Sequence, residues 1–196
     1  MADWLDRFEE VGWVEIPGFL TEPEAQSIRS DFEQLHMLEG FRQAGIGKQQ
    51  TQQIDTAQRG DLIRWIEPFG ALPSTRIYLD KIQGVIEELN RNFYLGIRDY
   101  ECHYALYPPG SFYKKHVDRH KAGSPRIVSS VLYLNSNWQP GDGGELCIYD
   151  ENDTPTTIQP LMGTLALFLS EKEHEVLTTQ RDRMSITGWM LNEKVF

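Results

Sequence analysis

The chain has 196 residues, of which 40% are hydrophobic and 24% are charged, and its formal net charge at pH 7 is -10. A domain of this size buries roughly 70% of the surface of its unfolded chain, so neither a disulfide nor a cofactor is needed for folding. The negative charge disfavours nucleic acid and membrane partners, and no basic secretory leader or apolar run of membrane-spanning length is present. We therefore expect a cytoplasmic protein with a single domain over residues 1–196, and a monomer is favoured.

Two segments of the N-terminal half have the spacing of amphipathic helices. In the first, Thr21 and Glu24 have the spacing of a capping box, and apolar residues follow at helical intervals as far as Leu35. The second covers about residues 74–92, with Ser74 as its expected N-cap. We interpret both helices as packing elements that support the rest of the domain.

A polar, glutamine-rich stretch, FRQAGIGKQQTQQIDTAQRGD, lies between these two helices and has little periodicity. A stretch of this length inside a compact domain is either a functional lid or a poorly ordered connection. Both interpretations stay open.

From Tyr100 onward the chain changes to short runs rich in Val, Ile, Tyr, Thr and Leu, separated by Pro, Gly, Asn and Asp. The expected strands are ECHYALY, FYKKHV, RIVSSVLYLN, ELCIYD, TLALFL, EVLTT and MSITGWML. Because no helical pattern separates them, they favour an antiparallel sandwich or barrel of the jelly-roll kind. The expected fold class is α+β, with a jelly-roll (double-stranded β-helix) core over residues 100–196 and helical support plus a candidate substrate loop over residues 1–99.

His116 and Asp118 are two residues apart, so on a strand their side chains project from the same face with Cα atoms about 7 Å apart. His174 begins a later expected strand, which a sandwich can bring beside the first. Two imidazoles and one carboxylate form the facial triad of non-haem iron(II) sites, which leaves adjacent coordination positions open, unlike a closed zinc site. Taken alone, a His-x-Asp pair is more often a surface pair.

Cys102 and Cys147 lack C-x-x-C spacing and are interpreted as reduced core thiols.

Three other histidines are weaker candidates for the metal. We interpret His103 as a strand residue whose ring is satisfied locally and His120 as the start of a loop. His36 lies at the end of a helix, where it would interact with the helix dipole.

Two arginines, Arg181 and Arg183, follow His174 and share one strand parity. A guanidinium donates two parallel hydrogen bonds to a carboxylate, so either arginine suits the second carboxylate of 2-oxoglutarate. The plainer interpretation of Arg183 is a surface ion pair. Strand geometry alone does not choose between the two arginines.

These motifs resemble those of the 2-oxoglutarate-dependent prolyl hydroxylases, in particular the hypoxia-inducible-factor prolyl hydroxylases and their bacterial homologues. The resemblance extends from about Gly12 to the end and is carried in order by RGDLIRWIE, YPPGSFYKKHVD, VLYLN, GGEL, HEV and R-x-S-I-T-x-W. It implies His116, Asp118 and His174 as the iron(II) ligands. It also selects Arg183, which completes the catalytic set, to bind the distal carboxylate of 2-oxoglutarate.

The same resemblance implies further residues around 2-oxoglutarate. Tyr133 would share the distal carboxylate with Arg183, Tyr107 would lie beside the chelating end, and Thr187 would lie on the floor of the pocket. Without the motifs, both tyrosines would be interpreted as core aromatic residues with paired hydroxyl groups.

A peptide site is also implied. Tyr113 and Trp189 would flank a target proline, and Arg126 would lie at the entrance. The glutamine-rich stretch would close over the substrate, with Arg59 and Asp61 as its anchors. The sequence of this stretch departs from the family pattern, which leaves the identity of the substrate open.

The implied enzyme is a dioxygenase that uses iron(II), 2-oxoglutarate and dioxygen, with ascorbate as an optional addition. It would hydroxylate a prolyl residue in a protein, for example elongation factor Tu, with release of succinate and carbon dioxide. Two alternatives stay open: a same-fold oxygenase acting on a free amino acid or small metabolite, and a non-catalytic jelly-roll module that binds metal or 2-oxoglutarate. A zinc hydrolase is disfavoured because Arg183 and the tyrosines would then have no role.

Overall fold

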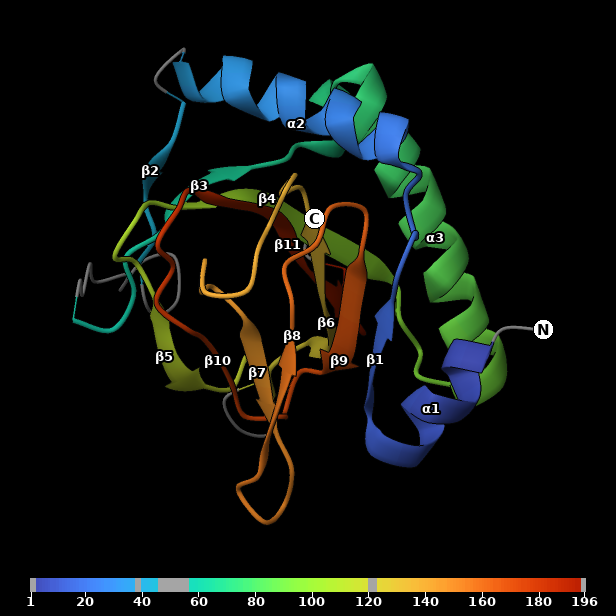
Figure 1. Ribbon diagram of the computed structural model, residues 1–196. Coiled ribbons are helices and arrows are strands. Elements are labelled where there is room, and N and C mark those ends of the chain that lie inside the picture. Colours follow the sequence, from blue (N-terminus) through green and yellow to red (C-terminus); the bar gives the residue numbers. More distant parts are fainter. Residues whose placement is uncertain (1–2, 38–39, 46–56, 120–122, 195–196) are drawn as a thin grey trace.

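The computed structural model describes residues 3–37, 40–45, 57–119 and 123–194. Two antiparallel sheets pack against each other, and the helices lie outside the larger sheet (Figure 1). The α-helices are α1 (Asp3–Val11), α2 (Glu22–Met37) and α3 (Pro73–Phe93), and a short 3-10 helix spans Pro68–Gly70. This arrangement confirms the predicted α+β fold with a jelly-roll core.

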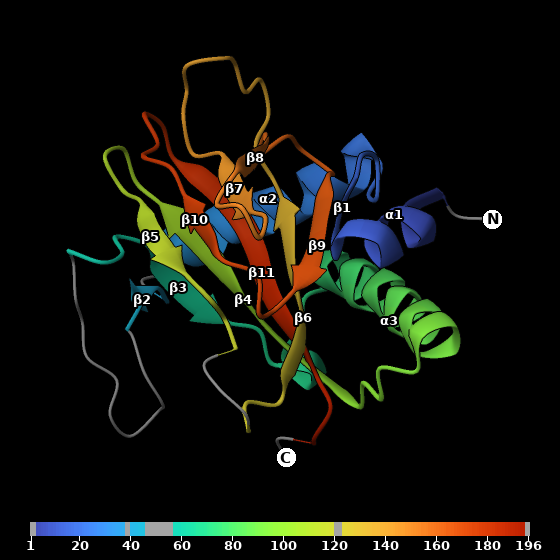
Figure 2. The same ribbon diagram turned by 90° about the horizontal axis from the view of Figure 1, so that it is seen from below.

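The larger sheet has the strand order β1-β9-β6-β11-β4-β3-β2, and β11 runs between β4 and β6 (Figure 2). In that order its strands are Trp13–Ile16, Leu165–Leu169, Arg126–Tyr133, Arg183–Leu191, Asp99–Tyr107, Leu62–Trp65 and Arg42–Gln43. The smaller sheet has the order β5-β10-β7-β8, with strands Tyr113–His116, His174–Val176, Leu146–Tyr149 and Pro155–Ile158.

Alternation along β4 separates the two hydrophobic cores. Cys102, Tyr104 and Leu106 face the core beneath the helices, whereas Ala105 and Tyr107 face the core between the two sheets. Successive strand residues point to opposite faces, so every second residue of the larger sheet points to the space between the sheets. That inner face carries Tyr107, Tyr133, Arg183, Thr187 and Trp189 among the predicted site residues.

The helix starts agree only partly with the sequence predictions. The predicted capping box is present: the backbone N–H and the hydroxyl of Thr21 donate to the Glu24 carboxylate at 2.8 and 2.9 Å. Ser74 was predicted as the N-cap of α3, and this is wrong, because the N-cap is Leu72 and makes no side-chain cap hydrogen bond. Proline suits the first helical position, so α3 begins at residue 73, and the buried Ser74 hydroxyl instead donates to Asp31 of α2.

Several short elements were not predicted, namely α1, β1, β2, β3 and β8. β1 pairs with β9 and β3 pairs with β4, so the N-terminal half adds strands as well as helices to the domain. The predicted strand EVLTT is shorter than expected, because β10 ends at Val176. Cys102 and Cys147 are both buried free thiols, as expected. Within the described ranges, no helix has the length and apolarity to cross a membrane.

Candidate active site

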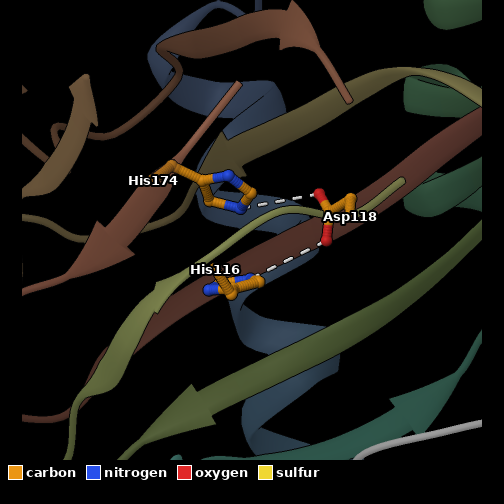
Figure 3. A group of neighbouring side chains, drawn as sticks. All are labelled: His116, Asp118 and His174. Atoms are coloured by element: carbon orange, nitrogen blue, oxygen red, sulfur yellow. Dashed lines mark ion pairs between the residues drawn. The ribbon is translucent and has the colours of Figure 1, made fainter. Parts of the chain in front are cut away.

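The three predicted metal ligands lie around one point (Figure 3). His116 ends β5, Asp118 follows two residues later, and His174 lies opposite His116 at the start of β10. Their ligand atoms all lie within 4.8 Å of one another. The Asp118 carboxylate oxygens are 3.8 Å from His116 Nε2 and 3.5 Å from His174 Nε2.

Backbone carbonyl groups orient both imidazoles. His116 Nδ1 lies 2.8 Å from the carbonyl oxygen of Lys114, and His174 Nδ1 lies 2.9 Å from that of Lys172. A carbonyl oxygen only accepts, so each Nδ1 carries the proton and each Nε2 keeps its lone pair. Two such nitrogens and a carboxylate are the donor set of a non-haem iron(II) site.

Two serines hold the carboxylate in place. Ser129 in β6 donates from its hydroxyl to Asp118 Oδ2 at 2.6 Å, and the Ser129 and Ser170 hydroxyl oxygens lie 2.9 Å apart. The Asp118 backbone N–H donates to the Ser170 carbonyl at 3.0 Å. The sequence interpretation missed both serines, although Ser129 lies in a buried strand, where a hydroxyl group needs a partner.

The electrostatics of the triad favour metal binding. Burial and the neighbouring His174 lower the pKa of His116 to about 3, so this imidazole is neutral at pH 7. Burial alone would raise the pKa of Asp118, but His174, His116 and the Ser129 hydrogen bond together lower it. His116 and Asp118 are therefore in the protonation states that a divalent metal requires.

A β-bulge brings Tyr113 beside the triad. The register of β5 against β10 shifts so that His174 pairs with His116 but Val176 pairs with Tyr113. Residues three apart on a regular strand point to opposite faces, and the bulge removes this restriction. The Tyr113 ring therefore stacks on His116 with centroids 3.6 Å apart and an interplanar angle of 15°. The Arg59 guanidinium lies 4.3 Å from the Tyr113 centroid.

Arg59 and Asp61 are joined by two hydrogen bonds of 2.6 and 2.5 Å, and Asp61 is fully buried. The backbone N–H of Ala44 donates to the Asp61 carbonyl at 3.0 Å, so this pair lies beside both ends of the glutamine-rich stretch. The middle of that stretch, residues 46–56, lies outside the described residues, as does His120. The closure of the glutamine-rich stretch over a substrate stays a prediction.

Arg183 is buried close to two tyrosines. Its side chain is 1% exposed, and its guanidinium carbon lies 5.0 Å from the Tyr107 centroid and 5.2 Å from the Tyr133 centroid. Nε donates to the Gly144 carbonyl at 2.7 Å, and a Cβ on Gly144 would lie 2.9 Å from Arg183 Cδ. Among the described residues, neither Arg183 Nη2 nor the Tyr133 hydroxyl has a hydrogen-bond partner. A carboxylate placed between these two groups would satisfy both.

Arg181 has a different environment. Its side chain is 46% exposed and pairs with Asp142 at 2.9 Å. Burial therefore distinguishes the two arginines, which strand parity does not. Arg183 is the one that can bind a buried carboxylate.

The remaining predicted residues lie along β11 and its neighbour β6. Thr187 is half-buried and pairs with Val131, while Trp189 is 7% exposed. The Arg126 guanidinium lies 3.6 Å from a Trp189 ring centroid and bonds Glu101 at 2.8 Å. The structure therefore brings Trp189 and Arg126 together, with the charge of Arg126 already paired.

Comparison with known proteins gives the family. The sequence profile of the 2OG-Fe(II) oxygenase superfamily matches residues 102–191. A prolyl-4-hydroxylase from Pseudomonas putida is 35% identical in sequence, and its crystal structure superposes with a TM-score of 0.88 over 97% of this chain and 98% of that chain. The chain belongs to the 2OG-Fe(II) oxygenase superfamily. As a 2OG-Fe(II) oxygenase it requires iron(II), 2-oxoglutarate and dioxygen. The triad fits iron(II), and Arg183 Nη2 and the Tyr133 hydroxyl, which lack partners among the described residues, fit a carboxylate of 2-oxoglutarate.

Two further structures show how widely this oxygenase fold is used. A prolyl hydroxylase from Trichoplax adhaerens, solved in complex with a hypoxia-inducible-factor oxygen degradation domain peptide fragment, is 25% identical, with a TM-score of 0.86 over 96% of this chain and 87% of that chain. A non-haem α-ketoglutarate-dependent epimerase from nogalamycin biosynthesis is 14% identical, with a TM-score of 0.74 over 95% of this chain and 79% of that chain. The latter shows the fold alone, so the substrate has to be argued from the site.

Proposed function

We propose that this 2OG-Fe(II) oxygenase hydroxylates a prolyl residue in a protein, with elongation factor Tu as a specific candidate. The observation that carries the proposal is a pair of aromatic rings flanking the triad. Tyr113 stacks on His116, and Trp189 pairs across the sheet with Ser129, which holds Asp118. The Tyr113 and Trp189 rings have the guanidinium groups of Arg59 and Arg126 beside them, and aromatic side chains near the metal site suit the uncharged pyrrolidine ring of proline. The similarity to two prolyl hydroxylases supports the same substrate.

The cofactor side of the proposal follows from donors and burial. His116, Asp118 and His174 would hold iron(II), while Arg183 and Tyr133 would bind the distal carboxylate of 2-oxoglutarate. Tyr107 would lie beside the chelating end and Thr187 on the floor of the pocket. When bound, iron(II) and 2-oxoglutarate supply the oxidising chemistry, with succinate and carbon dioxide as products. The protein orients both and keeps water away, since Arg183, Tyr107 and Tyr133 are at most 4% exposed.

On the substrate side, Tyr113 and Trp189 would flank the proline and Arg126 would lie at the entrance. Arg59 and Asp61 would anchor the glutamine-rich stretch where it closes over the peptide. A cytoplasmic location is part of the proposal, consistent with the free thiols of Cys102 and Cys147.

The competing substrate class is a free amino acid or small metabolite. A free amino acid carries an ammonium and a carboxylate, and both need oppositely charged partners when buried. Beside the aromatic pair, however, Arg126 is already paired with Glu101 and Arg59 with Asp61. This charge pairing favours an uncharged segment of polypeptide over a zwitterion.

The test incubates the enzyme with iron(II), 2-oxoglutarate and either purified elongation factor Tu or a bacterial extract, under isotopically labelled dioxygen. We expect mass spectrometry to find a prolyl residue that gains one labelled oxygen atom with wild-type enzyme but not with His174→Ala. Succinate formation that is stimulated by free amino acids, without hydroxyproline in any protein, would contradict the proposal.

A further inference from the structure

His103 lies on the inner face of the larger sheet, although it is not one of the predicted site residues. In the sheet register, His103 lies opposite Thr187. The neighbouring row on the same face contains Trp189 and Ser129, and Ser129 holds the carboxylate of the triad. The row on the other side contains Tyr133. His103 therefore lies between the metal end of the site and its 2-oxoglutarate end.

The ring of His103 is held between two tryptophans and presents an acceptor. It is 2% exposed, with its centroid 5.1 Å from that of Trp65 and 5.4 Å from that of Trp189. Nδ1 lies 3.1 Å from the Tyr104 carbonyl oxygen, so Nδ1 carries the proton and Nε2 has the lone pair. Burial and the charge of Arg59 lower the pKa of His103 to about 4, so the ring is neutral at pH 7. The hydrogen bond that this ring makes to the protein runs through Nδ1.

Trp189 presents the complementary donor. Its Nε1 is buried and has no acceptor among the described residues. Two other buried atoms share this property on the same face, Arg183 Nη2 and the Tyr133 hydroxyl. Buried polar groups are normally hydrogen-bonded, so an acceptor from outside the described residues would satisfy the Trp189 N–H.

We propose that His103 and Trp189 form a recognition site for an amide group of the substrate. His103 Nε2 accepts a hydrogen bond from an amide N–H, and Trp189 Nε1 donates one to an amide carbonyl. A neutral acceptor and a neutral donor on adjacent rings match an amide, whereas an ammonium or carboxylate would face uncharged partners. The rings must part to admit the amide. This inference rests on the proposed protein substrate and makes His103 a residue that determines specificity.

The test compares two blocked prolines that differ at one position. N-acetyl-L-proline N-methylamide has an N–H where N-acetyl-L-proline methyl ester has an oxygen, and both keep their carbonyl groups. The enzyme is loaded with 2-oxoglutarate and with zinc(II) in place of iron(II), and its indole N–H resonances are followed by NMR, with Trp189→Phe for assignment. We expect a saturable shift of the Trp189 resonance with both probes. The amide should bind about fivefold more tightly, the equivalent of one hydrogen bond of about 1 kcal/mol.

Variants of His103 test the acceptor directly. His103→Phe keeps an aromatic ring but lacks Nε2, so the preference for the amide should fall to about one. His103→Gln keeps an acceptor and should restore part of the preference. A preference that persists in His103→Phe overturns the proposal, as does a Trp189 resonance that neither probe shifts in the wild type.

Failure of the proposed function would look different. In that case the probes would still show the amide preference and its dependence on His103, but no protein would acquire hydroxyproline. Conversely, hydroxyproline in a protein together with equal binding of the two probes would support the proposed function and contradict the proposed amide site.

Discussion

Tyr133→Phe removes one oxygen atom from the core and should change ligand affinity and stability in opposite directions. Tyr133 is fully buried, and its hydroxyl has no partner among the described residues. An unpaired buried hydroxyl costs about 1–3 kcal/mol, so we expect the free energy of unfolding of the metal-free variant to stay equal or rise. A hydrogen bond to a charged group contributes about 1.5–3 kcal/mol, so the Kd for 2-oxoglutarate should rise about 10- to 100-fold.

Two assays measure these quantities on the same variant. Urea denaturation of metal-free protein gives the free energy of unfolding, and anaerobic titration of iron-loaded protein with 2-oxoglutarate gives the Kd through the charge-transfer absorption. Tyr104→Phe is a matched control, because Tyr104 is also buried in the larger sheet but its hydroxyl is hydrogen-bonded to Thr75 beneath the helices. The control should lose stability and keep its Kd. A destabilised Tyr133→Phe with unchanged Kd would refute the reasoning.

Three further results are expected. Arg183→Ala removes a buried charged donor and should raise the 2-oxoglutarate concentration needed for half-maximal succinate formation about 100-fold. Arg181 is exposed, so Arg181→Ala should leave this concentration unchanged. Equal effects of the two substitutions would point to another partner for the carboxylate. Ser129→Ala should weaken iron(II) binding about 10- to 100-fold, because Asp118 loses its hydrogen bond, and unchanged affinity in an anaerobic titration would deny Ser129 that role. In the unfolded chain, His103 takes up a proton between pH 7 and 5, because its ordinary pKa is 6.5. The folded ring, with a pKa of about 4, stays neutral over this range, so the free energy of unfolding falls as the pH falls. Urea denaturation should show that the wild type loses about 2 kcal/mol more than His103→Gln over this range, and equal losses would contradict the burial of a neutral ring.

Local patterns carried the predictions that were confirmed. The capping box of Thr21 and Glu24 depends on residues three apart. His116 and Asp118 were placed together because they are two residues apart, and they do meet, although β5 ends at His116 and Asp118 lies just beyond the strand. Both can be read from a short window of sequence.

The features that could not be predicted depend on contacts between distant strands. Tyr113 reaches His116 only because a bulge in β5 breaks the parity rule. Ser129 reaches Asp118 because β6 passes beside the end of β5, and no local pattern shows this. His103 was correctly expected to be a strand residue with a local hydrogen bond, but the sheet register was needed to place it beside Trp189.

The assignment of the triad and Arg183 is tested most directly by an anaerobic titration of iron(II) and 2-oxoglutarate into the metal-free protein, followed by admission of air. We expect a metal-to-ligand charge-transfer band that depends on both additions, and succinate that forms only once dioxygen enters. A folded, iron-loaded protein that gives neither the band nor succinate would contradict the assignment of the triad and Arg183, and would favour a jelly-roll module that binds without catalysis.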